Sequence, residues 1–143
     1  MPTLALVLGL ALTATLQAPP ATMRARLAPL PVDATTQAAI TGLGSATATL
    51  AGTTLTIEGT YKGLQTAATT VKVFHSPQRG LRGPLVGQFT SGGGTSGTFS
   101  GTITLTREQA TAFAMGLLYV QIQSEKAPDG NLWGWLLAAK GRR

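Results

Sequence analysis

From Met23 onward, the chain alternates between apolar and polar residues over short segments. In segment 54–64, leucine, isoleucine and glycine alternate with threonine and glutamate, which is the period of a strand with one buried face. The same pattern predicts strands at 23–30, 45–52, 69–75, 84–89 and 98–105. The short segment 51–54 predicts a hairpin, and the Gly/Ser-rich segment 90–97 predicts the end of a second hairpin, between 84–89 and 98–105.

The period changes once along the chain, directly after these strands. Thr106 stands where a helix N-cap would be, and Gln109 follows three residues later, which is the pattern of a capping box. Phe113 falls at helical spacing, and Gly116 can end the helix. We therefore expect one short helix near residues 107–115.

Two further strands are predicted after the helix, at 117–124 and 132–139. Between them, segment 125–130 contains Pro-Asp-Gly, in which proline presets φ and glycine accepts a positive φ. We expect the turn at this tripeptide. The whole pattern predicts an all-β fold, an antiparallel β-sandwich or barrel of about seven to nine strands with one short helix.

The N-terminal segment differs from the rest of the chain. Residues 3–16 form an apolar run of the length of a signal-peptide core, which is too short to span a bilayer. Small residues then allow cleavage after Ala18 or Ala21, although the basic residues that usually precede such a core are missing. We predict a signal peptide at 1–21 and a mature domain at 22–143, secreted or periplasmic or in the cell envelope. A buried first strand or helix is the alternative.

Composition narrows the function classes. Only 11% of the residues are charged and 43% are hydrophobic, which does not fit a disordered chain. The net charge is +6, but the basic residues are scattered, so we expect no nucleic-acid binding. The chain has no cysteine, which excludes disulfides, thiol catalysis and cysteine-based metal sites. After residue 16 the sequence has no apolar run long enough to span a membrane.

Three segments together resemble the CHRD domain, a module repeated in chordin and found singly in many exported bacterial proteins. They are TGLGSATATLAGTTLTIEGTYKGL, VKVFHSPQRGLRGPLV and LTREQATAFAMGLLYVQIQSEKAPDGNLWGWL. Their order and spacing follow the family, and the resemblance runs from about Arg24 to Leu137. In animal relatives these domains are parts of secreted signalling antagonists. The resemblance implies no established substrate for the isolated bacterial form.

The chain departs from this family at several polar positions. The family's His-x-His pair is reduced to Val73 and His75, and a further family histidine aligns with Gln123. A glutamate and an arginine of the family align with Asn131 and Trp133. This comparison suggests a retained architecture with an altered polar site. We expect His75 to hydrogen-bond the loop that follows it, and a degenerate copper or zinc site centred on His75 is the alternative.

The aromatic residues near the C-terminus are the candidate binding residues. Trp133 and Trp135 lie on one face of a strand, with Tyr119 nearby. The family's arginine at the position of Trp133 favours exposure of this face, although the two rings would fill the core if the face were buried. Arg79 and Arg82, in the preceding loop, could frame an anion site. The residues expected to face the core are Leu132, Gly134 and Leu136.

The sequence contains no recognisable catalytic pattern. No G-x-S-x-G nucleophile elbow occurs, and no G-K-[ST] follows the glycine run. We therefore expect no enzyme activity and no cofactor. The expected function is a non-enzymatic interaction or structural module, with an unknown protein or a cell-envelope ligand as its partner.

Overall fold

The computed structural model describes residues 21–31, 33–34 and 37–138. The predicted signal peptide lies outside these residues except for Ala21, which begins the first strand. The described part of the chain contains nine strands and one helix. They are β1 (Ala21–Pro29), β2 (Leu43–Ala51), β3 (Thr54–Lys62), β4 (Ala68–His75), β5 (Leu85–Thr90), β6 (Gly97–Thr104), α1 (Arg107–Ala114), β7 (Leu118–Ser124), β8 (Ala127–Trp135) and β9 (Leu137–Ala138).

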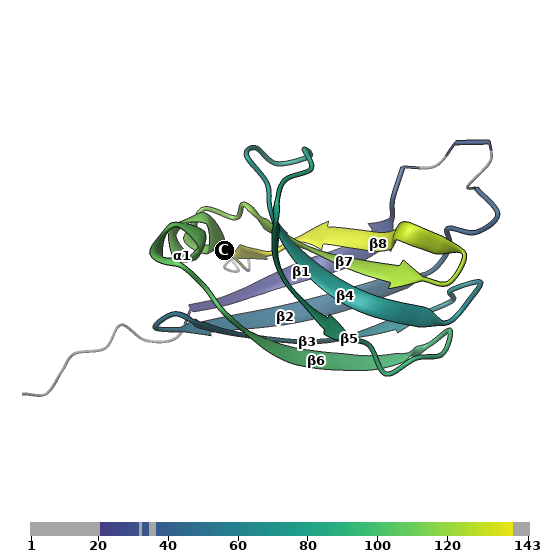
Figure 1. The fold of residues 1–143 in the computed structure, drawn as a ribbon, viewed down its shortest axis with the longest axis horizontal. Coiled ribbons are helices and arrows are strands. Elements are labelled where there is room, and N and C mark those ends of the chain that lie inside the picture. Colours follow the sequence, from purple (N-terminus) through teal and green to yellow (C-terminus); the bar gives the residue numbers. More distant parts are fainter. Residues whose placement is uncertain (1–20, 32, 35–36, 139–143) are drawn as a thin grey trace, which may run out of the picture.

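The strands form one antiparallel sheet that coils into a nearly closed barrel (Figure 1). The strand order is β5-β4-β7-β8-β1-β2-β3-β6, and the short β9 pairs with β1. Strand β1 joins the two halves of the barrel, because residues 21–27 pair with β2 whereas Ala28 and Pro29 pair with β8. The predicted all-β antiparallel fold with one short helix is confirmed.

The alternation predicted from the sequence sorts the side chains of each strand. On β4, Val71 and Val73 are fully buried inside the barrel, whereas Lys72 and Phe74 face outward and are half-buried. Strand β7 is an exception, because all seven of its residues are buried. The outward side chains of β7 are therefore shielded from solvent, as its inward ones are. In this respect the outer surface at β7 differs from that at β4, where the outward side chains are only half-buried.

The helix forms as predicted. The backbone N–H of Gln109 donates to Thr106 Oγ1 at 3.2 Å, and the N–H of Thr106 donates to Gln109 Oε1 at 2.9 Å. Gly116 follows the helix with φ +74°, a conformation that favours glycine. Phe113 projects from α1 into the core and is fully buried. The helix lies at one end of the barrel (Figure 1).

The predicted turn between β7 and β8 is wrong in its position. Ser124 pairs with Ala127, so the turn consists of Glu125 and Lys126, and Pro-Asp-Gly lies inside β8. The turn is held by residues far away in the sequence, since the N–H of Glu125 donates to the carbonyl of Ala67 at 3.1 Å. Gly130 of β8 leaves room for the Gln121 side chain of the neighbouring strand β7, because a Cβ at Gly130 would lie 2.4 Å from that side chain.

The predicted hairpin between β5 and β6 is also wrong. These strands are the two ends of the sheet, where β5 pairs with β4 and β6 pairs with β3. The connection between them is held against the β3–β4 loop instead, as the N–H of Leu64 donates to the carbonyl of Thr95 and the N–H of Ala68 donates to the carbonyl of Gly94. It therefore carries the chain from one half of the barrel to the other.

Side-chain packing closes the seam between β5 and β6. Ile103 of β6 packs on Gly87 of β5, where a Cβ would come within 2.9 Å of the isoleucine. Phe89 of β5 packs on Gly101 of β6, where a Cβ would lie 2.4 Å from the ring. Each glycine provides the space that the opposite side chain fills.

Candidate functional site

The outer face of β4, β7 and β8 carries a cluster of four aromatic side chains. Phe74 pairs with Tyr119, and Tyr119 pairs with Trp135, so three of the rings lie side by side across three strands. Trp133 is two residues before Trp135 and therefore shares its face. We call Phe74, Tyr119, Trp133 and Trp135 the aromatic cluster.

The rings of the aromatic cluster are in direct contact. The ring centroids of Phe74 and Tyr119 are 5.0 Å apart and stacked. Those of Tyr119 and Trp135 are also 5.0 Å apart, and Trp133 meets Trp135 edge-on at 4.8 Å. Such separations are typical of favourable aromatic pairs, so the four rings form one packed unit.

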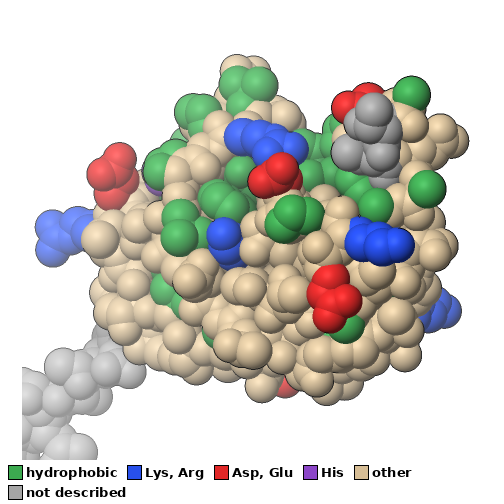
Figure 2. All heavy atoms as spheres, turned by 45° about the vertical axis from the view of Figure 1, so that its right-hand side comes forward, with side chains coloured by type: hydrophobic (Ala, Val, Ile, Leu, Met, Phe, Trp, Pro, Cys, Tyr) green, Lys and Arg blue, Asp and Glu red, His purple; other side chains and the backbone are tan. Residues whose placement is uncertain are grey.

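The aromatic cluster is only partly exposed. Tyr119 is 1% exposed, whereas Phe74, Trp133 and Trp135 are half-buried. Leu132 and Gly134 of β8, and Leu136 directly after it, are inside the barrel, as predicted. In the space-filling view, hydrophobic side chains gather on the upper part of the surface, in and beside a recess between two projections (Figure 2). The two tryptophans therefore belong to the outer surface rather than to the core.

The loop of residues 76–84 is hydrogen-bonded to the aromatic cluster. The N–H of Gly83 donates to the hydroxyl of Tyr119 at 3.2 Å. The hydroxyl of Ser76, which is fully buried, faces the carbonyls of Gln78 and Leu81, the second at 2.7 Å. Hydrogen bonds within the loop, made by Ser76, and one hydrogen bond to Tyr119 of β7 therefore hold the loop in place.

Replacing Tyr119 with phenylalanine should loosen this loop while leaving the ring in place. The N–H of Gly83 would lose its partner in a partly buried position, which costs about 1 kcal/mol. We expect a loss of that size in urea unfolding and faster amide hydrogen exchange at Gly83. Unchanged exchange at Gly83 would contradict the role assigned to the Tyr119 hydroxyl.

The two arginines that could frame an anion site, Arg79 and Arg82, both lie on this loop. Both Arg79 and Arg82 are exposed. The guanidinium of Arg79 lies near Gly116, where a Cβ would be 3.5 Å from its Nη2. Arg79 thus lies against the C-terminal end of α1, where the helix dipole favours a cation. The structure gives Arg82 no hydrogen bond or ion pair within the described residues.

The polar side chains beyond the aromatic cluster hold neighbouring segments. Asn131 is fully buried, accepts a hydrogen bond from Ser124 Oγ at 2.9 Å and donates to the carbonyl of Thr41 at 2.7 Å. Gln121 donates to the carbonyl of Asp129 at 2.8 Å. Local alternation along the chain does not indicate this role for Asn131, because its partner Thr41 is 90 residues away.

His75 lies away from these polar residues. It pairs with Leu118 at one end of β7, whereas Gln123 is near the other end. Its imidazole forms no hydrogen bond among the described residues, and the histidine contacts the loop through its backbone N–H, which donates to the carbonyl of Pro84 at 2.9 Å. The expected hydrogen bond from His75 to the loop is therefore present, but the backbone makes it, and the side-chain hydrogen bonds to the loop come from Ser76 and Tyr119.

The surroundings of His75 bear on the alternative metal site. The imidazole lines a shallow pocket with Arg107, Glu108, Thr111 and Met115 of the α1 region. No group of three or more His, Cys, Asp or Glu residues that could hold a metal ion occurs within the described residues.

In the part of the chain that the structure describes, no helix has the length and apolar character needed to cross a membrane.

Comparison with known proteins gives the family. Residues 20–136 match the family model of the CHRD domain, a stretch that includes every strand from β1 to β8 and the helix. No curated protein and no solved structure matches the chain. The matched stretch contains all four residues of the aromatic cluster and covers most of the 143 residues. The chain therefore belongs to the CHRD domain family.

Proposed function

We propose that this CHRD domain is an exported, non-enzymatic binding module of the cell envelope or the extracellular space, and that the aromatic cluster is its binding surface. One observation carries the proposal: three large aromatic side chains, Phe74, Trp133 and Trp135, are half-exposed side by side on the outside of the barrel. Grouped aromatic side chains on a surface mark binding sites for ligands and partners.

The barrel does not need these rings for its own core. The interior at β7 and β8 is filled by Leu118, Val120, Ile122, Leu132 and Leu136, all fully buried. The indole N–H of Trp135 is buried without a hydrogen-bond partner among the described residues, and such a group is costly.

The chemistry of the face supports binding rather than catalysis. It consists of aromatic rings, of amides that are already hydrogen-bonded, as Gln121 is to Asp129 and Asn131 is to Thr41, and of Lys72, which is in register with Gln121. Such a surface buries apolar area and orients a partner. It offers no acid–base pair of the kind that general catalysis uses.

The two tryptophans provide a direct test, because they are the only ones in the chain and both are in the aromatic cluster. Intrinsic fluorescence should shift when the purified protein is mixed with a soluble ligand, and cosedimentation should detect binding to insoluble envelope material. We would use isolated cell walls, soluble envelope polysaccharide and phospholipid vesicles as separate probes. The Trp133→Leu variant should bind the positive probe at least tenfold more weakly.

The control is Met115→Ala, which removes an exposed apolar side chain that is 61% accessible at the end of α1. It should bind as the unmodified protein does. Equal binding by the Trp133→Leu variant would contradict the proposal. If that variant does not fold, quenching of the unmodified protein by acrylamide decides, because a bound ligand must protect the tryptophans from the quencher.

A further inference from the structure

A second surface, on the other half of the barrel, is built almost entirely from hydroxyl groups. Strands β2, β3 and β6 pair in register, so Ser45, Thr60 and Thr98 form one row across the sheet. A neighbouring row contains Thr47, Glu58 and Ser100. The side chains of these rows face outward, because residues that alternate with them along the strands, such as Ala46, Ile57 and Phe99, are buried in the core. We call these two rows the hydroxyl face.

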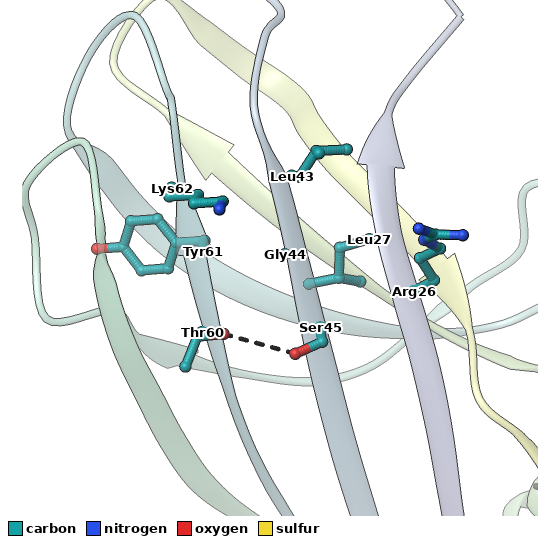
Figure 3. Close-up of a pocket in the computed structure, with 8 residues that line it drawn as sticks. All are labelled: Arg26, Leu27, Leu43, Gly44, Ser45, Thr60, Tyr61 and Lys62. Atoms are coloured by element: carbon teal, nitrogen blue, oxygen red, sulfur yellow. Dashed lines mark hydrogen bonds between the residues drawn. The ribbon is translucent and has the colours of Figure 1, made fainter.

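The hydroxyl face is hollowed rather than flat. Two adjoining hollows, of about 340 and 480 Å³, share Ser45 and Thr60. The hydroxyls of these two residues lie 3.5 Å apart at the boundary between the hollows (Figure 3). A ligand lying across both hollows would therefore meet a continuous series of hydroxyl groups.

Cations border this face. Lys62 of β3 and Arg26 of β1 line the first hollow and stand on either side of Ser45 (Figure 3). Arg24 is in register with Thr47 of the second hollow. All three side chains are exposed and none forms an ion pair within the described residues, whereas Glu58 is the one carboxylate in the two rows. The face is therefore complementary to an acidic ligand.

The spacing of the cations favours a polymer over a single small anion. Arg26 and Lys62 are on strands separated by β2, and Lys62 is two residues beyond the position in register with Arg26, so the two are about 12 Å apart at the backbone. One phosphate or sulfate ion cannot contact both cations closely without large side-chain movements, whereas successive acidic groups along a chain can. The hydroxyls between the two cations can donate to and accept from the hydroxyls of a sugar.

A protein partner suits this face less well. Protein interfaces depend on buried aromatic or large apolar anchors, and the one exposed large apolar side chain that lines these hollows is Leu43, at 53% exposure. We infer that the hydroxyl face binds an acidic polysaccharide, with Arg26 and Lys62 contacting its acidic groups and the row of Ser45, Thr60 and Thr98 contacting its hydroxyls. This inference does not depend on the aromatic cluster.

Calorimetric titration with polygalacturonate at an ionic strength of about 0.15 M tests the inference, with dextran, sodium sulfate and anionic phospholipid vesicles as parallel probes. The double variant Arg26→Gln/Lys62→Gln should bind polygalacturonate at least tenfold more weakly. The matched control is Arg107→Gln/Lys126→Gln, which removes the same charge from exposed positions on α1 and the β7–β8 turn. It should lose no more than about twofold, because distant exposed charges are largely screened. Thr60→Val should also weaken binding, because it removes a hydroxyl while keeping the shape.

Each other outcome overturns the inference. Equal losses in the two double variants would mean a general charge effect, and equal affinity for dextran would mean that the cations have no role. Binding of sulfate alone, or of vesicles alone, would assign the face to a small anion or to a lipid surface. The Trp133→Leu variant should bind polygalacturonate normally, so failure here is distinguishable from failure of the aromatic-cluster proposal.

Discussion

Replacing Gly134 with alanine should lower the free energy of unfolding by roughly 2–3 kcal/mol, the usual cost of overpacking. Gly134 lies on the inward face of β8, where β8 meets β1. A Cβ at this position would be 2.2 Å from the backbone carbonyl oxygen of Arg26 and 3.1 Å from Leu27 Cδ2. A backbone oxygen cannot move aside as the end of a side chain can, so β1 and β8 would have to separate.

Urea unfolding followed by far-UV circular dichroism measures this loss. The control is Gly97→Ala in β6, where the nearest atom to a new Cβ is the Tyr61 hydroxyl oxygen at 3.3 Å. Neither glycine has a positive φ, so backbone strain is absent from both variants and the difference reports the steric contact. The control should lose under about 1 kcal/mol, because a glycine-to-alanine change without strain is close to neutral or stabilising. Equal losses would show that Gly134 is not required for the approach of β1 to β8.

Truncating Phe113 to alanine should cost roughly 3–5 kcal/mol, as is usual for a buried phenylalanine. The ring is fully buried and belongs to the barrel core. It is also the main anchor of α1, which has only eight residues, and helices this short are not stable alone in water. The variant should therefore lose core packing and release the helix from the end of the barrel.

Two measurements separate these effects. Urea unfolding gives the total loss, and amide hydrogen exchange in α1 shows whether the helix opens before the barrel does. Thr111→Ala is the control, since Thr111 is exposed on the same helix and its hydroxyl bonds only the carbonyl of Arg107, at 3.1 Å. This change should be nearly neutral, because alanine is the better helix former. A loss below about 1 kcal/mol for Phe113→Ala would contradict the anchoring role, since it is far below the usual cost of such a truncation.

The candidate site was predictable only in part. Period-two alternation places Trp133 and Trp135 on one face of their strand. The family's arginine at the position of Trp133 favoured exposure of that face, and the structure places it on the outside of the barrel. The contact of Phe74 with Tyr119 depends on the register of β4 against β7 and could not be read from either strand alone. The resemblance marked Asn131 only as a changed polar position, and its hydrogen bond to Thr41 was not predictable because it depends on the position of Thr41 in space.

The sequence by itself determined the local features: the strands, the inward and outward side chains, and the helix with its capping box of Thr106 and Gln109. These features depend on residues a few positions apart, so their periodicity is visible in the chain. The hairpin of β2 and β3 was also predictable, but the tertiary structure alone decided which strands distant in the sequence pair and where two connections turn. Residues 64–68 hold both the Glu125–Lys126 turn and the connection that separates β5 from β6. The physical reason is that backbone hydrogen-bond partners in a sheet are chosen by long-range register, which local alternation does not specify.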